Sequence, residues 1–241
     1  MMKPVLLVTM VLCCVLAHGH AEEKEWKTDI GLSYVATTGN TSTETFSGNA
    51  GTEGTVKSIR CLAKGSYLIT RDNQEEKANK LNLNGRAEKI ITAGLFGFVE
   101  TVYSRDKYSG YTYRASVGPG IGYDIVQRET VQLKGLLSSL YYFDKYSAGP
   151  VDKKNYGTLK SELICKWTLN ERVYWENQGN YLTSLEDGEQ YFINFETKLD
   201  VSMNSRLAIG VSYRVNYQNK PPAAEIKKTD TSFMTSLIIH L

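Results

Sequence analysis

Several features that mark common protein classes are scarce or missing in this sequence. Its 241 residues include only 5 prolines, 4 cysteines and 3 histidines. The 28 Lys and Arg residues nearly balance the 26 Asp and Glu residues, which gives a formal net charge of +2. This balance argues against a nucleic-acid-binding protein, which carries a clustered basic excess, and against an acidic disordered tail. No run of about 18 apolar residues occurs, so the sequence encodes no transmembrane helix.

The N-terminal segment has the composition of an export signal. A short basic start is followed by an apolar stretch, Pro4–Ala17, and then by small residues at positions 19 and 21. Such a stretch has the size of a signal-peptide core and is too short to cross a bilayer. We therefore predict a signal peptide over residues 1–21 and one exported domain over residues 22–241, with an uncleaved anchor as the less favoured alternative.

The cysteines give little indication of chemistry. Cys13 and Cys14 lie inside the predicted signal peptide and lack the small residues that normally precede a lipoprotein cysteine. Cys61 and Cys165 remain in the mature chain, where an exported protein can form a disulfide. Both fall on the apolar phase of predicted strands that are far apart in the sequence. We expect them to be small apolar fillers, with a disulfide as the alternative.

The mature chain is dominated by a strict alternation of two kinds of residue. From Tyr113 to Ile125 the odd positions are apolar or aromatic, whereas the even positions are glycine, serine or charged. The alternation recurs in residues 131–144, 155–168, 190–203, 206–217 and 229–241, and no odd position of these segments is charged. A period of two residues is typical of a β-strand with two different faces. One face of the predicted sheet therefore excludes charge.

Further segments fit this pattern less regularly and raise the predicted number of strands to twelve. They are residues 26–36, 44–54, 59–69, 79–88, 95–104 and 172–183. Short connections are expected near residues 55–56, 91–93, 127–130, 170–171 and 204–205, and mostly longer ones at residues 38–41, 71–77, 105–112, 145–154, 184–189 and 219–227. Short turns at one end and longer loops at the other are typical of bacterial outer-membrane barrels.

Two further observations favour a membrane barrel over a soluble one, which would show the same alternation. Twelve long strands would enclose an interior too wide for side chains to fill, since about eight strands already reach that limit. Aromatic residues such as Trp167, Trp175 and Tyr141 lie near the predicted strand ends, while Leu, Ile and Val fill the middle. Two aromatic belts around an aliphatic band suit a bilayer. We predict an all-β, twelve-stranded antiparallel up-and-down outer-membrane β-barrel with short periplasmic turns and longer external loops.

Four motifs in this order resemble a known family. They are Ser33-Tyr34 followed by Thr38–Thr41, then Arg105–Tyr111, Gly118–Tyr123 and the closing strand from Lys228 to Ile239. The chain resembles the domain of unknown function family 481, whose members are labelled salt-induced outer-membrane proteins of Gram-negative bacteria. The resemblance spans essentially the whole mature chain and implies a barrel in outer-membrane lipid, while the molecular activity of the family is uncharacterised.

The last residue departs from what is usual in this class of protein. Outer-membrane barrels usually end in an aromatic residue, whereas this chain ends in Leu241. We therefore expect altered recognition by the barrel-assembly machinery during biogenesis.

The charged positions on the inward phase are candidates for lining the barrel interior. They are Arg86, Arg114, Asp124, Lys134, Lys160, Glu162, Lys166, Glu196, Lys198, Arg206, Arg214 and Asp230. Their Arg and Lys side chains could line a pore that selects anions, or they could pair with carboxylates and fill the interior. The mixed signs favour pairing. Gly118, Gly120 and Gly122 share the inward phase, and we expect them to leave open space that favours a solvent-filled interior.

The loop between the fifth and sixth predicted strands is a second candidate site. Arg105, Asp106, Ser109 and Gly110 in this loop could bind an ion or a ligand, although a turn is the commoner reason for such residues. The only histidine of the mature chain, His240, is poorly placed for a general base because it lies next to the end of the last strand. We therefore predict no catalytic residue, no metal and no cofactor.

Three functions remain open on these grounds. The first is a small passive pore or envelope protein linked to salt or osmotic stress, as the family label suggests. The second is a closed, non-conducting barrel that binds a ligand or partner through its external loops. An outer-membrane enzyme is a remote third.

Overall fold

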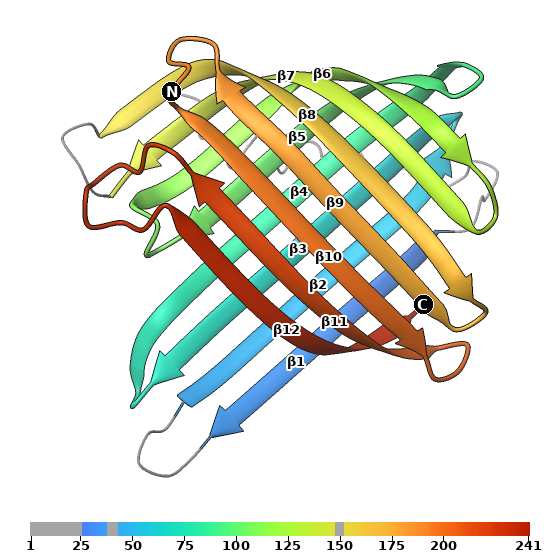
Figure 1. The fold of residues 1–241 in the computed structure, drawn as a ribbon, viewed down its shortest axis with the longest axis horizontal. Helices are drawn as coiled ribbons and strands as arrows, with labels where there is room; N and C mark the ends of the chain where they lie inside the picture. The colour runs from blue at the N-terminus through green and yellow to red at the C-terminus, as the bar shows by residue number, and fades with distance from the viewer. Residues whose placement is uncertain (1–25, 38–42, 148–151) are drawn as a thin grey trace.

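The computed structural model describes residues 26–37, 43–147 and 152–241, which form a closed barrel of twelve strands (Figure 1). The strands are β1 (Lys27–Thr37), β2 (Thr43–Val56), β3 (Ile59–Asp72), β4 (Glu75–Thr92), β5 (Leu95–Asp106), β6 (Tyr111–Gln127), β7 (Val131–Tyr146), β8 (Lys153–Asn170), β9 (Val173–Ser184), β10 (Tyr191–Ser202), β11 (Leu207–Gln218) and β12 (Thr229–His240). No helix in these described ranges is long and apolar enough to cross a membrane. The predicted signal peptide, with Cys13 and Cys14, and the loop motif Thr38–Thr41 lie outside the described residues.

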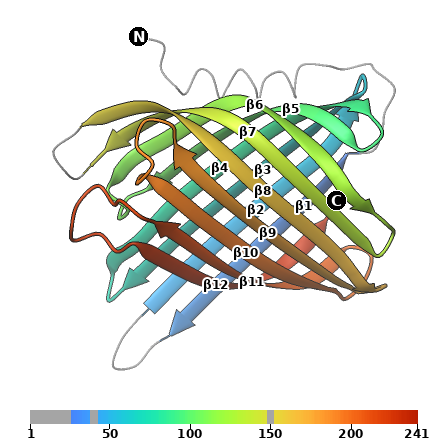
Figure 2. The same cartoon turned by 45° about the horizontal axis from the view of Figure 1, so that its top comes forward.

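Each strand pairs antiparallel with its neighbours in the sequence, and β12 closes the wall against β1 (Figures 1 and 2). The predicted up-and-down topology and the number of strands are confirmed. The connections at residues 57–58, 93–94, 128–130, 171–172 and 203–206 lie at one end, which we call the short-turn end. The opposite end, which carries residues 107–110, 185–190 and 219–228, is called the long-loop end.

One predicted loop is wrong. Residues 71–77 are not a long connection, because β3 and β4 extend to a turn made of Asn73 and Gln74 alone. Both residues have positive φ angles, 48° and 68°, which is the backbone conformation that a two-residue hairpin turn requires. The polar residues on either side of this turn do not alternate with apolar ones, so the sequence pattern concealed the strand ends.

The apolar phase of the alternation faces outward. On β7, Leu137 is 50% exposed, whereas its neighbour Leu136 points into the barrel and is 6% exposed. The same outward exposure holds for large apolar residues on the other strands, including Ile121, Leu163 and Phe195. A soluble barrel would bury this face, so the outer wall has the apolar surface that a bilayer requires. Cys61 and Cys165 are both free, and the disulfide alternative is wrong.

Aromatic side chains on the outer wall gather near the two ends of the strands. Trp167 and Trp175 stack with ring centroids 6.0 Å apart near the short-turn end. Near the long-loop end, the ring centroid of Tyr191 lies 5.8 Å from that of Tyr181 and 6.0 Å from that of Tyr217. Two such belts with aliphatic residues between them fit the two interfaces of a membrane.

The closure between β1 and β12 is much shorter than the other strand pairings. It consists of four residue pairs, from Asp29–His240 to Leu32–Leu237, and of the adjoining backbone hydrogen bonds between Thr28 and Leu241. In contrast, β1 pairs with β2 along its whole length from Lys27 to Thr37. We call this contact between β1 and β12 the seam. Beyond Leu32 the two strands diverge toward the long-loop end (Figure 1).

Candidate functional site: the barrel interior

The interior next to β5, β6, β7 and β8 is filled by packed side chains. Phe96 and Phe98 are buried and lie against the inner face of β6, where a Cβ atom on Gly120 or Gly122 would clash with their rings. Gly118 is covered as well, because a Cβ atom there would collide with the backbone of β7. The expectation that these glycines leave open space is wrong. They are small because aromatic rings and a neighbouring strand occupy the volume above them.

Arg114 links this packed region to the opposite wall. Its guanidinium lies 4.2 Å from the ring centroid of Phe192 on β10, although three strands separate β6 from β10 along the wall. The Arg114 Nε atom is 3.2 Å from Asp144, and the side chain donates a hydrogen bond of 2.9 Å to the Tyr156 hydroxyl. The charge is therefore paired and enclosed by aromatic rings, and it fills space instead of lining a passage.

A buried ion network lies beside these rings. The Lys160 Nζ atom on β8 is 3.0 Å from Glu100 on β5 and 2.6 Å from Glu162. Ser138 donates a further hydrogen bond of 2.7 Å to Glu100, whose side chain is 1% exposed. Because β6 and β7 lie between β5 and β8, the contact between Lys160 and Glu100 runs through the interior. We call the inner surface of β4–β8 the packed arc.

The inner surface of β9–β12 and β1–β3, which we call the open arc, is different. Lys64 on β3 is 59% exposed although its ammonium lies 3.7 Å from Glu176 on β9, on the opposite side of the barrel. Glu176 also contacts Lys166 at 3.6 Å, near the boundary between the two arcs. The Arg214 guanidinium lies 2.8 Å from the Glu196 carboxylate, and both side chains are partly exposed to solvent. Charged groups of the open arc therefore remain hydrated, whereas most of those of the packed arc do not.

The remaining predicted interior residues are also paired, with one exception. Arg86 contacts Glu88 at 2.8 Å, Lys134 contacts Asp124 at 3.5 Å, Lys198 contacts Asp200 at 2.8 Å, and Asp230 contacts Lys80 at 3.4 Å. The exception is Arg206, which lies in the exposed turn between β10 and β11 and not on a strand. Its placement on the inward phase is wrong because the strand begins only at Leu207.

The candidate loop residues lie at the long-loop end. Arg105 and Asp106 belong to the end of β5 and not to the loop, which corrects their expected position. Asp106 contacts Lys80 at 2.9 Å, and the Ser109 hydroxyl donates to the Asp106 carbonyl oxygen at 2.9 Å. These contacts stabilise a turn, in which Gly110 has a φ angle of 81°.

The loop between β11 and β12 reaches across the long-loop end to this turn. A Cβ atom on Gly110 would collide with Ile226 of that loop. At the start of the loop, Gln218 donates a hydrogen bond of 2.7 Å to the Tyr111 hydroxyl on β6. Lys220 is 2.6 Å from Asp187 in the β9–β10 loop, and this hydrogen bond lowers the pKa of Asp187 below its ordinary value. The loop therefore narrows the mouth of the barrel at this end.

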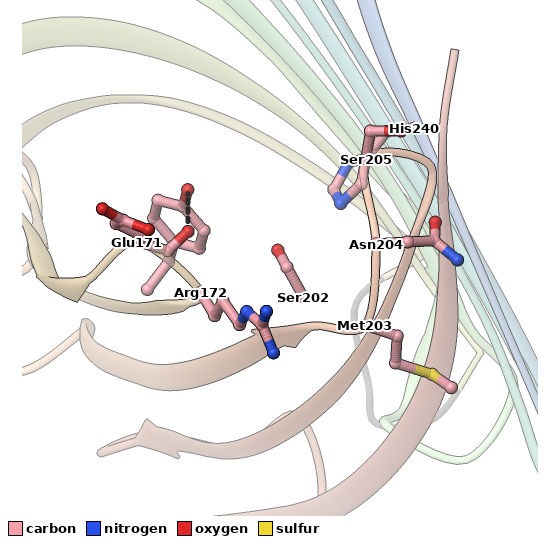
Figure 3. Close-up of a pocket in the computed structure, with 8 residues that line it drawn as sticks. Glu171, Arg172, Ser202, Met203, Asn204, Ser205 and His240 are labelled. Carbon is pink, nitrogen blue, oxygen red and sulfur yellow. Dashed lines mark hydrogen bonds between the residues drawn. The ribbon is translucent and has the colours of Figure 1, made fainter.

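A hollow of about 510 Å³ opens at the short-turn end of the open arc. Figure 3 shows Glu171 and Arg172 on one side of it and Asn204, Ser205 and His240 on the other. The His240 Nδ1 atom lies 2.5 Å from Asp29 across the seam. Within the part of the chain that the structure describes, no three His, Cys, Asp or Glu residues form a group that could hold a metal ion.

Several interior residues were missed at the level of sequence. Lys64, Glu100 and Glu176 complete the contacts described above. All three occupy the inward phase of their strands, and that phase is the signal that identifies them. The first five strands alternate less regularly than the later ones, which is why Lys64 and Glu100 were not selected.

Comparison with known proteins identifies a family and a relative. The model of a family described as "Protein of unknown function, DUF481" matches residues 30–240. The uncharacterized protein YdiY of Escherichia coli strain K12 is 21% identical over 215 residues, which cover 89% of this chain and 83% of YdiY.

Two solved structures show what this chain is similar to in fold. The NanC porin matches with a TM-score of 0.51 and 8% identity, over 89% of this chain and 97% of the porin. The translocator domain of the autotransporter NalP from Neisseria meningitidis matches with a TM-score of 0.47 and 9% identity, over 98% of this chain and 93% of that domain. At such identities the likeness to NanC shows the fold alone.

Proposed function

This chain belongs to the DUF481 family, and from that premise we propose that it is an outer-membrane protein that acts as a narrow passive pore for small polar solutes. The observation that carries the proposal is the contrast between the two sides of the wall. The outer side chains are apolar and exposed, while charged side chains of the open arc, such as Lys64 and Arg214, keep contact with solvent. A wet path inside an apolar wall is the basic requirement of a membrane pore.

The position of the wet path follows from the packing. The packed arc is closed by aromatic rings and by the Lys160 network, so solutes would pass along the open arc. The hollow beside Arg172 and His240 supports this route because it lies at the short-turn end of the same arc. The bridge from Lys64 to Glu176 would be a narrow point of the path. Charges of both signs face it, so we expect weak selectivity between anions and cations.

Planar-bilayer recording of the purified, folded protein tests the pore. We expect single-channel steps well below those of a wide porin, and the absence of steps above background would remove the proposal. Ser212→Trp places a large ring inside the open arc and should reduce the conductance several-fold. Its matched control is Val211→Trp, because the neighbouring residue of β11 points outward; this variant should conduct like the unchanged protein.

A second candidate is the closed barrel that binds a ligand or partner at its external loops. The contacts of Ile226 and Gln218 across the long-loop end favour it. A variant with a shortened β11–β12 loop separates the two candidates. If the unchanged protein is silent and the shortened variant conducts, the loop closes the barrel and the pore proposal falls in favour of this one.

We also propose that the pore contributes to adaptation to salt or osmotic stress, as the label of the resembling family suggests. A strain that lacks the protein should grow more slowly than its parent after a shift to high salt, and equal growth would remove this role. Catalysis is not part of the proposal, and lipase and protease assays of the purified barrel would detect it.

A further inference from the structure

Among the residues that the structure describes, the seam leaves two strand edges without a partner. The pairing of β1 with β12 ends at Leu32 and Leu237. Residues Ser33–Thr37 of β1 and Thr229–Ser236 of β12 lie beyond it, and each of these segments is paired on its other side only, with β2 and β11 respectively. Val35 shows the effect on a side chain: it points toward the interior and is nevertheless 54% exposed.

These free edges lie at membrane depth. β1 has 11 residues and β12 has 12, and a tilted strand needs about 9–11 residues to cross the hydrocarbon core. Neither strand is therefore long enough to place its unpaired half outside the membrane. Backbone N–H and C=O groups without partners cost several kcal/mol each in hydrocarbon. An open seam in lipid would be unstable unless another strand satisfied these groups.

The two edges complement each other. β1 and β12 are antiparallel within one chain, and all copies enter a membrane in the same orientation. A two-fold axis along the membrane normal therefore places β12 of one copy antiparallel to β1 of its partner, and the same contact occurs twice. Such a contact uses one surface on both copies and closes without leaving a further edge.

The outward side chains along these edges suit a contact between proteins. Tyr34 and Phe233 are among the most exposed aromatic residues of the outer wall. Thr229, Thr231 and Thr235 face the same way along β12. Hydroxyl side chains are favoured where transmembrane helices meet, because they hydrogen-bond across the contact, and we expect the same of strands.

We propose that the seam is a dimer interface in which β12 of each copy pairs with β1 of a second copy of this chain at the long-loop end. The interface is independent of whether the barrel conducts. It accounts for a wall that is closed by four residue pairs at the short-turn end and open above them.

Disulfide cross-linking in native membranes tests the proposal. In a background where Cys61 and Cys165 are replaced by alanine, Tyr34→Cys is combined with Thr235→Cys, the positions that would face each other if the register from Leu32–Leu237 continued. We expect mild oxidation to yield a disulfide-linked dimer. A disulfide within one chain would show that the seam closes on itself, and thiols that remain reduced would show that no strand lies beside the edge. Either result would overturn the proposal.

Two further measurements keep the test independent of the folding of that variant. A single Leu199→Cys substitution on the outer face of β10 should give no dimer, and an equal yield would mean that the cross-links report random collision. The mass of the unsubstituted protein, extracted in a mild detergent, should correspond to two chains. A mass of one chain across the range of protein concentrations would also overturn the proposal.

Discussion

The Lys160 network allows a sharp test of the packed arc. Lys160→Met removes the ammonium that lies 3.0 Å from Glu100 and 2.6 Å from Glu162, while it keeps a side chain of similar length. The two carboxylates, 1% and 3% exposed, would then stay buried without a counter-charge and would repel each other. Breaking a buried ion pair by removing one partner typically costs about 3–5 kcal/mol. We expect a loss of about that size in the free energy of unfolding.

A matched control lies on the same face of the same strand. Lys166 also points inward from β8 and contacts Glu176, but its side chain is 50% exposed. An exposed pair contributes about 0–1 kcal/mol, so Lys166→Met should change the stability by no more than that. Urea unfolding of the barrel from lipid bilayers, followed by tryptophan fluorescence, measures both variants.

The reasoning also predicts a rescue. When Lys160→Met is combined with Glu100→Gln and Glu162→Gln, the buried charges disappear and most of the loss should be recovered, because neutral groups of the same shape replace a charged network at little cost. Equal stabilities of the two single variants, or a triple variant no more stable than Lys160→Met alone, would refute the assignment of this region as a dry, charge-paired interior.

Three further predictions address other parts of the molecule. Leu137→Arg on the outer face should destabilise the barrel by about 2–4 kcal/mol in lipid, as a charge at the midplane of the bilayer does; a change below about 0.5 kcal/mol, which is usual for surface substitutions in water, would argue that this face is not in lipid. Gly122→Val should prevent folding because its side chain meets the Phe96 ring, and adding Phe96→Ala should partly restore the folded band in gel electrophoresis; a stable single variant would contradict the packing. The pair between Asp187 and Lys220 depresses the pKa of Asp187, so its stabilisation of the β11–β12 loop is present above the ordinary pKa of an aspartate and is lost as the pH falls through the depressed value. Proteolysis of that loop should therefore accelerate only in acid, and a rate independent of pH would refute the contact.

The strands themselves were predictable because the two sides of a membrane wall impose a period of two on the sequence. The segment from Tyr113 to Ile125 alternates without exception, and β6 contains it entirely. The start of β4 was not predictable, because polar residues occupy both faces where the hairpin with β3 extends past the apolar band. Alternation arises where the two faces of a strand meet different environments, lipid and the barrel interior. It is absent where both faces meet water.

The contacts inside the barrel were beyond the reach of the sequence pattern. Alternation assigns Glu100 and Lys160 to the same side of the wall. Only closure of the sheet, however, brings the Lys160 ammonium within 3.0 Å of the Glu100 carboxylate, because the two residues are far apart in the sequence. The glycines at positions 118, 120 and 122 illustrate the same point, because their phase was correct and the conclusion drawn from their size was wrong. A missing side chain indicates space only when no neighbour fills it, and the neighbours here are Phe96 and Phe98.

Because its interior is filled unequally, the barrel should also differ in stiffness from one side of its wall to the other. Contacts from β5 to β8 and from β6 to β10 act as cross-braces on one side. On the other side, many inner positions of β11, β12, β1 and β2 carry short side chains, such as Gly31, Gly51 and Gly210. The contacts that cross the barrel there are made by solvent-exposed charges, Lys64 to Glu176 and Asp230 to Lys80. A tube stiffened along one flank yields along the other when it is squeezed. Lateral pressure from a thicker or more tightly packed bilayer would therefore flatten the more weakly braced flank first, and the cross-section available to solutes would shrink while the other flank kept its curvature.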